Sequence, residues 1–182
     1  MPFIGRLPLI LALVLPELAA AQSARDEASG LAVTPPPGYD VRPLPPLSGQ
    51  AARFGLHTPA DTDTGCQVSF TPVPQNNRFS QAELDAVMAG TAWQGMARTA
   101  ISSLYAVRES ATLPLKGRTG FVMVGDFQER PDLPPRARAV RTLFVIQESP
   151  RGRTSTVCVG ERMGFDARRS EFMAVAAGAV VP

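Results

Sequence analysis

The pattern of apolar and polar residues predicts four consecutive β-strands in the second half of the chain. The four strand-like runs cover residues 104–115, 118–128, 136–148 and 154–161. Short segments rich in glycine and proline separate them, such as Lys116-Gly117 and Pro150-Arg151-Gly152. Short turns between consecutive strands indicate an antiparallel meander. The two central runs are apolar on both faces, so we expect other elements to cover both sides of this sheet.

Two further strands are predicted ahead of the meander, over residues 51–57 and 65–73. The clearest local signal follows them, in Phe79-Ser80-Gln81-Ala82-Glu83-Leu84. Ser80 and Glu83 have the spacing of a capping box, in which each side chain satisfies a backbone amide at the start of a helix. Apolar residues continue at helical spacing, which predicts one long helix from Ser80 to about Ser102.

The C-terminal segment has a second helical pattern. A stripe of apolar residues at helical spacing follows Asp166, and we expect a helix from Asp166, as the N-cap, to about Val180. Together these patterns predict an α+β fold, in which an antiparallel β-sheet carries a long helix and a C-terminal helix packed on it.

The N-terminal 21 residues have the pattern of a secretory signal peptide. Arg6 supplies a positive charge, residues 7–15 are almost entirely apolar, and Ala19-Ala20-Ala21 is a small-residue cleavage site. An apolar run of this length is too short to cross a bilayer as a helix. We therefore expect cleavage near Ala21, a periplasmic or secreted protein, and no transmembrane segment after cleavage.

The rest of the chain is interpreted as one domain with a leading segment. Residues 22–47 begin with small polar residues and then hold six prolines, so we expect a mobile, proline-rich N-terminal segment. Residues 48–182 form the predicted single α+β domain.

The chain has two cysteines, Cys66 and Cys158, and both lie in strand-like runs. In an oxidising compartment such a pair is first interpreted as a disulfide. The alternative is a catalytic thiol with His57 as its base. No family signature surrounds either cysteine, which favours the disulfide.

Charge is distributed unevenly although the net charge is only +2. Residues 130–169 carry nine arginines against four acidic residues, a local charge of +5. Such asymmetry indicates either a solvated basic face or an anion-binding site. The arginines considered for anion binding are Arg136, Arg138, Arg141, Arg151 and Arg153. No nucleic-acid-binding motif is present, and nucleic acid is not expected as a partner.

Candidate catalytic and metal-binding groups are few. His57 is the only histidine, and the G-x-S-x-G motif that would make it part of a hydrolase triad is absent. Asp61 and Asp63 alternate as in calcium loops, but the glycine and glutamate of such a loop are missing. Asp126 lies with Glu129 and Asp132 near a strand end, where paired carboxylates would be needed for acid–base chemistry. The sequence predicts no metal site and no cofactor.

The order of elements resembles the PsbP-like fold. The matching features are the lead-in Pro36-Pro37-Gly38-Tyr39, two strands, a capped helix, a meander and a C-terminal helix. The resemblance implies an α/β/α sandwich and a non-catalytic binding or assembly role, with a protein of the cell envelope as the expected partner. An envelope enzyme with an unfamiliar site and a protein that binds small anions remain as alternatives.

Overall fold

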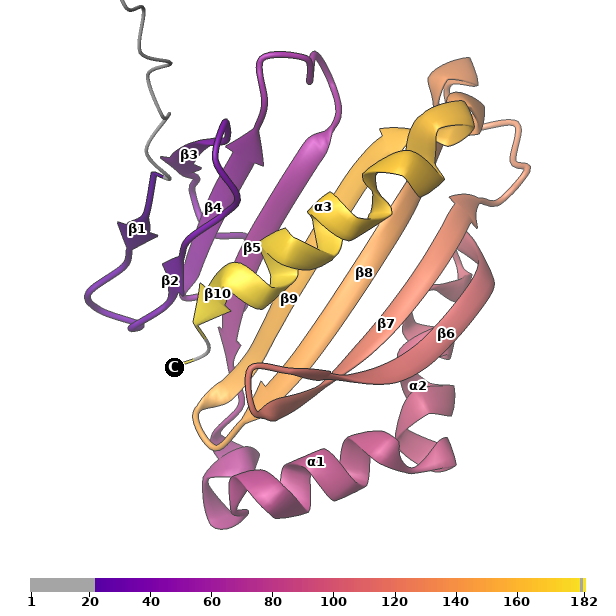
Figure 1. Ribbon diagram of the computed structural model, residues 1–182. Helices are drawn as coiled ribbons and strands as arrows, with labels where there is room; N and C mark the ends of the chain where they lie inside the picture. The colour runs from indigo at the N-terminus through magenta and orange to yellow at the C-terminus, as the bar shows by residue number, and fades with distance from the viewer. Residues whose placement is uncertain (1–21, 181) are drawn as a thin grey trace, which may run out of the picture.

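The computed structural model describes residues 22–180 and residue 182, and a seven-stranded antiparallel sheet forms its centre (Figure 1). The strands lie in the order β3-β4-β5-β9-β8-β7-β6. Their bounds are β3 Asp40–Pro43, β4 Ala52–His57, β5 Gly65–Pro72, β9 Gly152–Glu161, β8 Val140–Ser149, β7 Arg118–Phe127 and β6 Tyr105–Leu115. The pairing of β5 with β9 joins the N-terminal strands to the C-terminal half of the chain.

The predicted meander is confirmed, because β6, β7, β8 and β9 are neighbours in both sequence and space. Lys116 and Gly117 connect β6 to β7 with positive φ angles of 47° and 80°. Positive φ at both central residues is the backbone of a type I′ hairpin turn, which suits the twist of paired strands. Gly152 opens β9, where a Cβ would lie 2.3 Å from the Thr71 carbonyl oxygen. Glycine therefore allows β5 to approach this turn closely.

The capping box at Ser80 is confirmed, but the single long helix is not. Ser80 accepts a hydrogen bond from the Glu83 amide at 3.3 Å, and its own amide donates to Glu83 at 2.7 Å. Helix α1 spans Gln81–Ala89 and helix α2 spans Thr91–Ser102. Gly90 between them is extended, with φ −75° and ψ 141°. Glycine is a poor helix former, and the break lets α1 pack on β7 and β8 while α2 packs on β6.

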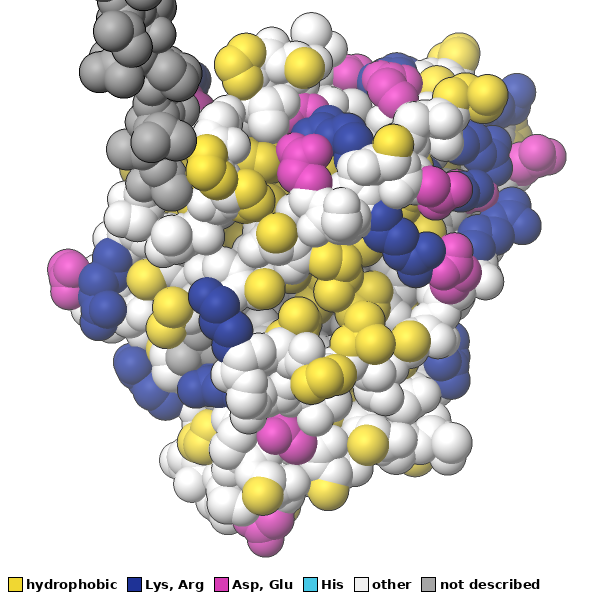
Figure 2. All heavy atoms as spheres, viewed as in Figure 1, with side chains coloured by type: hydrophobic (Ala, Val, Ile, Leu, Met, Phe, Trp, Pro, Cys, Tyr) yellow, Lys and Arg dark blue, Asp and Glu magenta, His cyan; other side chains and the backbone are white. Residues whose placement is uncertain are grey.

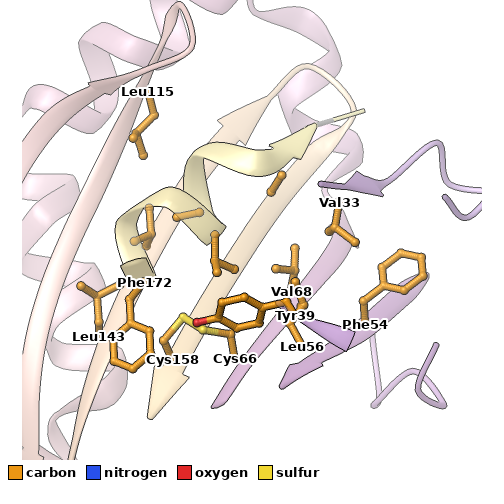
Figure 3. Packing of buried hydrophobic residues seen from close by; sticks show 14 of the residues in the cluster. Val33, Tyr39, Phe54, Leu56, Cys66, Val68, Leu115, Leu143, Cys158 and Phe172 are labelled. Atoms are coloured by element: carbon orange, nitrogen blue, oxygen red, sulfur yellow. A yellow bond between two sulfur atoms is a disulfide. The ribbon is translucent and has the colours of Figure 1, made fainter. Parts of the chain in front are cut away.

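The C-terminal helix α3 spans Phe165–Gly178 and covers the opposite face of the sheet (Figure 1). The predicted N-cap is corrected by two residues, because Gly164 holds that position and Asp166 lies in the first helical turn. The larger of two hydrophobic cores lies under α3, and Figure 3 shows Phe172 of the helix close to Leu143 of β8 and to the disulfide. Helices thus cover both faces of the sheet, in an α/β/α arrangement.

Cys66 and Cys158 form the disulfide that the sequence predicts. They stand directly opposite each other on β5 and β9, and both are fully buried (Figure 3). The bond therefore joins the N-terminal strands to the meander inside the larger core.

The proline-rich N-terminal segment contributes to the fold, in contrast to the boundary expected at residue 48. Strands β1 Ala24–Arg25 and β2 Ala32–Val33 form a small sheet with β10 Ala179–Val180, in the order β1-β2-β10. Leu31 and Tyr39 from this segment are buried in the larger core. Periodicity could not reveal this packing, because the strands are too short to show an alternating pattern.

The predicted signal peptide, residues 1–21, lies outside the described residues. Within the part of the chain that the structure describes, no helix has the length and apolar character needed to cross a membrane.

Candidate functional site

An open pocket of about 590 Å³ lies beside the β3–β4 edge of the sheet. We call it the β3–β4 pocket. Polar and charged side chains account for much of its wall, which includes Tyr39, Asp40, Arg42, His57, Asp61 and Thr62. These residues come from β3, from the end of β4 and from the loop between β4 and β5. That loop therefore forms one side of the pocket.

Asp61 fixes the loop in place, and its side chain has no exposed surface. Its carboxylate accepts hydrogen bonds from the Thr58 amide at 2.9 Å and from the Thr64 hydroxyl at 2.7 Å. Arg168 of α3 donates to it at 2.6 Å. Burial alone would raise the pKa of Asp61, but these hydrogen bonds outweigh burial and hold the pKa well below its usual range. Asp61 is thus a permanent anion whose acceptor sites are occupied.

Arg168 extends this network to Tyr39 on the pocket wall. It lies 3.1 Å from Glu171, and the Tyr39 hydroxyl donates to the same carboxylate. Burial and the hydrogen bond to Glu171 raise the pKa of Tyr39 above its ordinary value. The hydroxyl therefore stays protonated and acts as a donor. The network joins the pocket wall to α3, so the shape of the pocket depends on the docking of that helix.

His57 ends β4 and lines the pocket, with its Nδ1 2.9 Å from the Thr64 carbonyl oxygen. A carbonyl oxygen only accepts, so Nδ1 carries the hydrogen, and Nε2 is the acceptor of the neutral ring. Asp61 is bonded to Thr58, Thr64 and Arg168, and not to His57. Among the described residues, His57 is therefore not oriented by a carboxylate as in a catalytic triad.

The alternating Asp61 and Asp63 are both paired with arginines, Asp61 with Arg168 and Asp63 with Arg136. Their oxygens are thus engaged with cationic groups of the protein. In the described part of the chain, no three His, Cys, Asp or Glu side chains are grouped so that they could hold a metal ion.

The carboxylates considered for acid–base chemistry are not brought together. Asp126 is buried and receives hydrogen bonds from three arginines: Arg108 at 3.0 Å, Arg141 at 2.8 Å and Arg162 at 2.6 Å. Burial would raise the pKa of Asp126, but the arginines lower it to about 2. Asp132 is paired with Arg130 instead.

The five arginines considered for anion binding lie at the two ends of the β8–β9 hairpin. Arg136 and Arg138 are in the short 3-10 helix Pro135–Ala139 that precedes β8, and Arg141 follows at the start of that strand. Arg151 and Arg153 lie at the turn and at the start of β9. Three of the five form ion pairs: Arg136 with Asp63 and Glu161, Arg141 with Asp126, and Arg153 with Glu148. The structure does not gather them into one site, and anion binding by this set stays a prediction.

Sequence reasoning did not find Arg168 and Tyr39. The two side chains that Arg168 joins most closely, Asp61 and Glu171, lie 107 and three residues away from it. Tyr39 was part of the Pro-Pro-Gly-Tyr lead-in, but nothing in that motif indicates a hydrogen bond to α3. Only the spacing of Arg168 and Glu171 along one helix was visible in the sequence.

Comparison with known proteins supports the fold. No family model matches the chain, and no curated protein matches its sequence. Among solved structures, it is similar to cyanobacterial PsbP (CyanoP) from Synechocystis sp. PCC 6803, with a TM-score of 0.56 and 13% identity. That match covers 95% of this chain and 99% of the cyanobacterial one. A protein of unknown function from Pseudomonas aeruginosa, PA94, matches with a TM-score of 0.43 and 11% identity, over 89% of this chain and 96% of its own.

The fold is therefore PsbP-like, as the order of elements in the sequence suggested. The resemblance extends over nearly the whole chain, including the N-terminal segment. At 13% identity it establishes the fold and does not assign a function.

Proposed function

We propose that this chain is an exported, non-enzymatic binding or assembly module that works in the periplasm or outside the cell. The signal-peptide pattern of residues 1–21 supports export. The buried Cys66–Cys158 bond is consistent with an oxidising compartment.

The observation that carries the proposal is the state of the two best-buried aspartates. Asp61 accepts hydrogen bonds from Arg168, Thr58 and Thr64, and Asp126 accepts them from three arginines; both have lowered pKa values. A general acid or base for neutral pH needs a pKa near 7, with a free lone pair or proton directed at a substrate. Carboxylates whose oxygens are all engaged by donors of the protein are suited to holding a surface in one shape, and this favours recognition over proton transfer.

The β3–β4 pocket is the recognition surface in this proposal. Its wall is held by Asp61 and Arg168, so little ordering is needed when a partner binds. It presents the ion pair of the Arg42 guanidinium and the Asp40 carboxylate, 2.5 Å apart, beside the His57 ring. A polar segment of an envelope protein would match this mixture of groups.

The test is chemical crosslinking in intact cells, followed by affinity purification and mass spectrometry of the crosslinked products. The proposal expects one envelope protein at near-equal stoichiometry, crosslinked to residues around the pocket. An Arg168→Gln variant should lose most of this product, whereas Arg98→Gln on α2 serves as a control and should retain it. Recovery of the protein alone from wild-type cells would contradict the proposal.

One observation favours the second candidate, an envelope enzyme. The single histidine lines the β3–β4 pocket, with Nδ1 fixed by the Thr64 carbonyl. Purified protein should be assayed against ester and amide substrates, with His57→Gln as the matched variant. Turnover that His57→Gln abolishes would establish the enzyme, and it would overturn the non-enzymatic module.

A further inference from the structure

A second pocket, of about 240 Å³, lies at the other end of α3, where the chain leaves the helix and enters β10. We call it the hairpin pocket because the β6–β7 hairpin forms one side of it. Its walls are Leu115, Lys116, Arg118, Gln147, Ala179 and Val180. Figure 2 shows several Lys and Arg side chains (dark blue) gathered at this end of the molecule, to the left in the view.

The two charged residues of the hairpin pocket are both cations. Neither Lys116 nor Arg118 forms an ion pair with any residue that the structure describes. The Nη1 atom of Arg118 is buried and has no hydrogen-bond partner among the residues that the structure describes. A buried guanidinium donor without a partner is unfavourable, so this site favours an anion. In contrast, Arg141 at the opposite end of β8 is paired with Asp126.

Gln147 adds a neutral polar group to the same wall. Its residue is only 4% exposed, and its side-chain amide forms no hydrogen bond with the described residues. Gln147 of β8 stands opposite Gly120 of β7, and Gly120 lies two residues after Arg118 on that strand. Alternate residues of a strand share a face, so Arg118 and Gln147 lie on the same side of the sheet. That side is the one covered by α3, because Val122 and Val145 of the same strands belong to the larger core.

The remaining wall is apolar and close-fitting. Leu115 is nearly buried, and a Cβ at Gly120 would lie 2.4 Å from its Cδ1 atom. Glycine at position 120 therefore leaves space for Leu115 to line the pocket. Ala179 and Val180 supply the other apolar contacts. A ligand that satisfies this pocket needs an anionic head and a short apolar body.

We propose that the hairpin pocket binds a small amphipathic carboxylate. The carboxylate accepts hydrogen bonds from Arg118 and Gln147 and faces the charge of Lys116, while the short hydrocarbon chain packs on Leu115, Ala179 and Val180. Charge-assisted hydrogen bonds of this kind are stronger than neutral ones. The site lies apart from the β3–β4 pocket, so the proposal goes beyond the binding role proposed above and does not depend on it.

The test uses the purified, disulfide-bonded protein, labelled with nitrogen-15 and titrated with sodium hexanoate. We expect saturable shifts of the backbone amides at residues 115–118, 147 and 179–180, and no comparable shifts around the β3–β4 pocket. Hexanamide has nearly the same shape without the charge, and it should bind at least tenfold more weakly. Equal binding of hexanamide and hexanoate would overturn the proposal.

Substitutions in the hairpin pocket test which side chains bind the carboxylate of hexanoate. Arg118→Gln should weaken hexanoate binding at least tenfold, because it removes the guanidinium whose Nη1 atom is buried without a partner among the described residues. Lys116→Asn should weaken it severalfold and keep the hairpin folded, since Asn-Gly is a preferred type I′ turn. Arg130→Gln removes one exposed charge beyond the other end of β7 and is the matched control, with unchanged hexanoate affinity expected.

If Arg118→Gln does not fold, Lys116→Asn decides the question alone. Hexanoate affinity that is unchanged in Lys116→Asn and in any folded Arg118→Gln protein would overturn the proposal. The in-cell crosslinking experiment does not involve this pocket, so a failure here leaves the proposed binding or assembly role standing.

Discussion

The helices on the two faces of the central sheet bury very different numbers of residues. On one face, α3 buries five residues, and Phe165 and Phe172 among them belong to the core that also contains the disulfide. On the other face, α2 buries none of its residues, and Met96 is 65% exposed. The smaller core there has four buried members among the described residues: Met88, Phe121, Met123 and Phe144.

This difference indicates that packing on the α3 face contributes more to the stability of the fold than packing on the α2 face. Polar contacts follow the same division, because Arg168 of α3 is bonded to Asp61 and Glu171, whereas α2 forms one side-chain bond to the sheet, from Arg98 to Ser110 at 2.8 Å. Both candidate binding pockets adjoin α3. We therefore expect the α3 face to unfold only with the whole domain, and α2 to open locally first.

The disulfide should have the largest effect on stability. Replacing both Cys66 and Cys158 by alanine should lower the free energy of unfolding by about 4–5 kcal/mol, because the bond closes a long loop in the unfolded chain. Urea denaturation followed by circular dichroism measures the change. Wild-type protein kept reduced should lose a similar amount. If the free energy of unfolding changed by less than about 1 kcal/mol, the disulfide would not account for the greater stability expected of the α3 face.

Truncation on each face tests the comparison directly. Phe172→Ala should cost about 3–5 kcal/mol, because it empties a fully buried site under α3. Met96→Ala is the counterpart on α2 and should change the free energy of unfolding by no more than about 0.5 kcal/mol. Chemical denaturation of both variants gives these values. Similar losses would mean that the two helices are docked equally.

Acid should weaken the cluster around Asp126. Its folded pKa of about 2 lies below the ordinary value of 3.8, so the ionised group stabilises the fold fully above about pH 4. That contribution, about 2 kcal/mol, is lost as pH falls through about 2. Asp126→Asn should be destabilised at pH 7 by about 2 kcal/mol and should lose less stability between pH 4 and pH 2 than wild type. Identical acid profiles would show that Asp126 is not held by its arginines.

The capping box of α1 should have the smallest effect. Ser80→Ala removes the acceptor for the Glu83 amide and should cost about 1 kcal/mol. Hydrogen exchange should show faster exchange in the first turn of α1, with the amides of α3 unchanged. Ser170→Ala, in an exposed position on α3, is the control and should change neither quantity.

The sequence made the local features of the fold predictable. The meander, the capping box and the disulfide each depend on residues close in sequence or on a unique cysteine pair. The helix break at Gly90 was missed because apolar spacing continues across it, although the glycine itself weakens a helix. The packing of residues 22–47 could not be predicted, because Leu31 and Tyr39 are buried in a core built mostly from residues far away in the sequence.

The candidate pockets were much less predictable. The single histidine was visible, but its neighbours Tyr39 and Asp61 meet Arg168 only after α3 docks. The hairpin pocket combines residues from the β6–β7 hairpin, from β8 and from β10. These three segments are far apart in the sequence, so no local pattern indicates that they form one pocket. The Nη1 atom of Arg118 is buried without a hydrogen-bond partner among the described residues, and only the folded structure shows this.

The most direct test of the proposed role is site-specific photocrosslinking in living cells. A photoreactive amino acid replaces exposed Thr62 on the rim of the β3–β4 pocket, and in a separate strain it replaces exposed Ala86 on α1. We predict one discrete crosslinked envelope protein from position 62 and none from position 86. Crosslinks of equal yield from both positions, or from position 86 alone, would contradict recognition at this pocket.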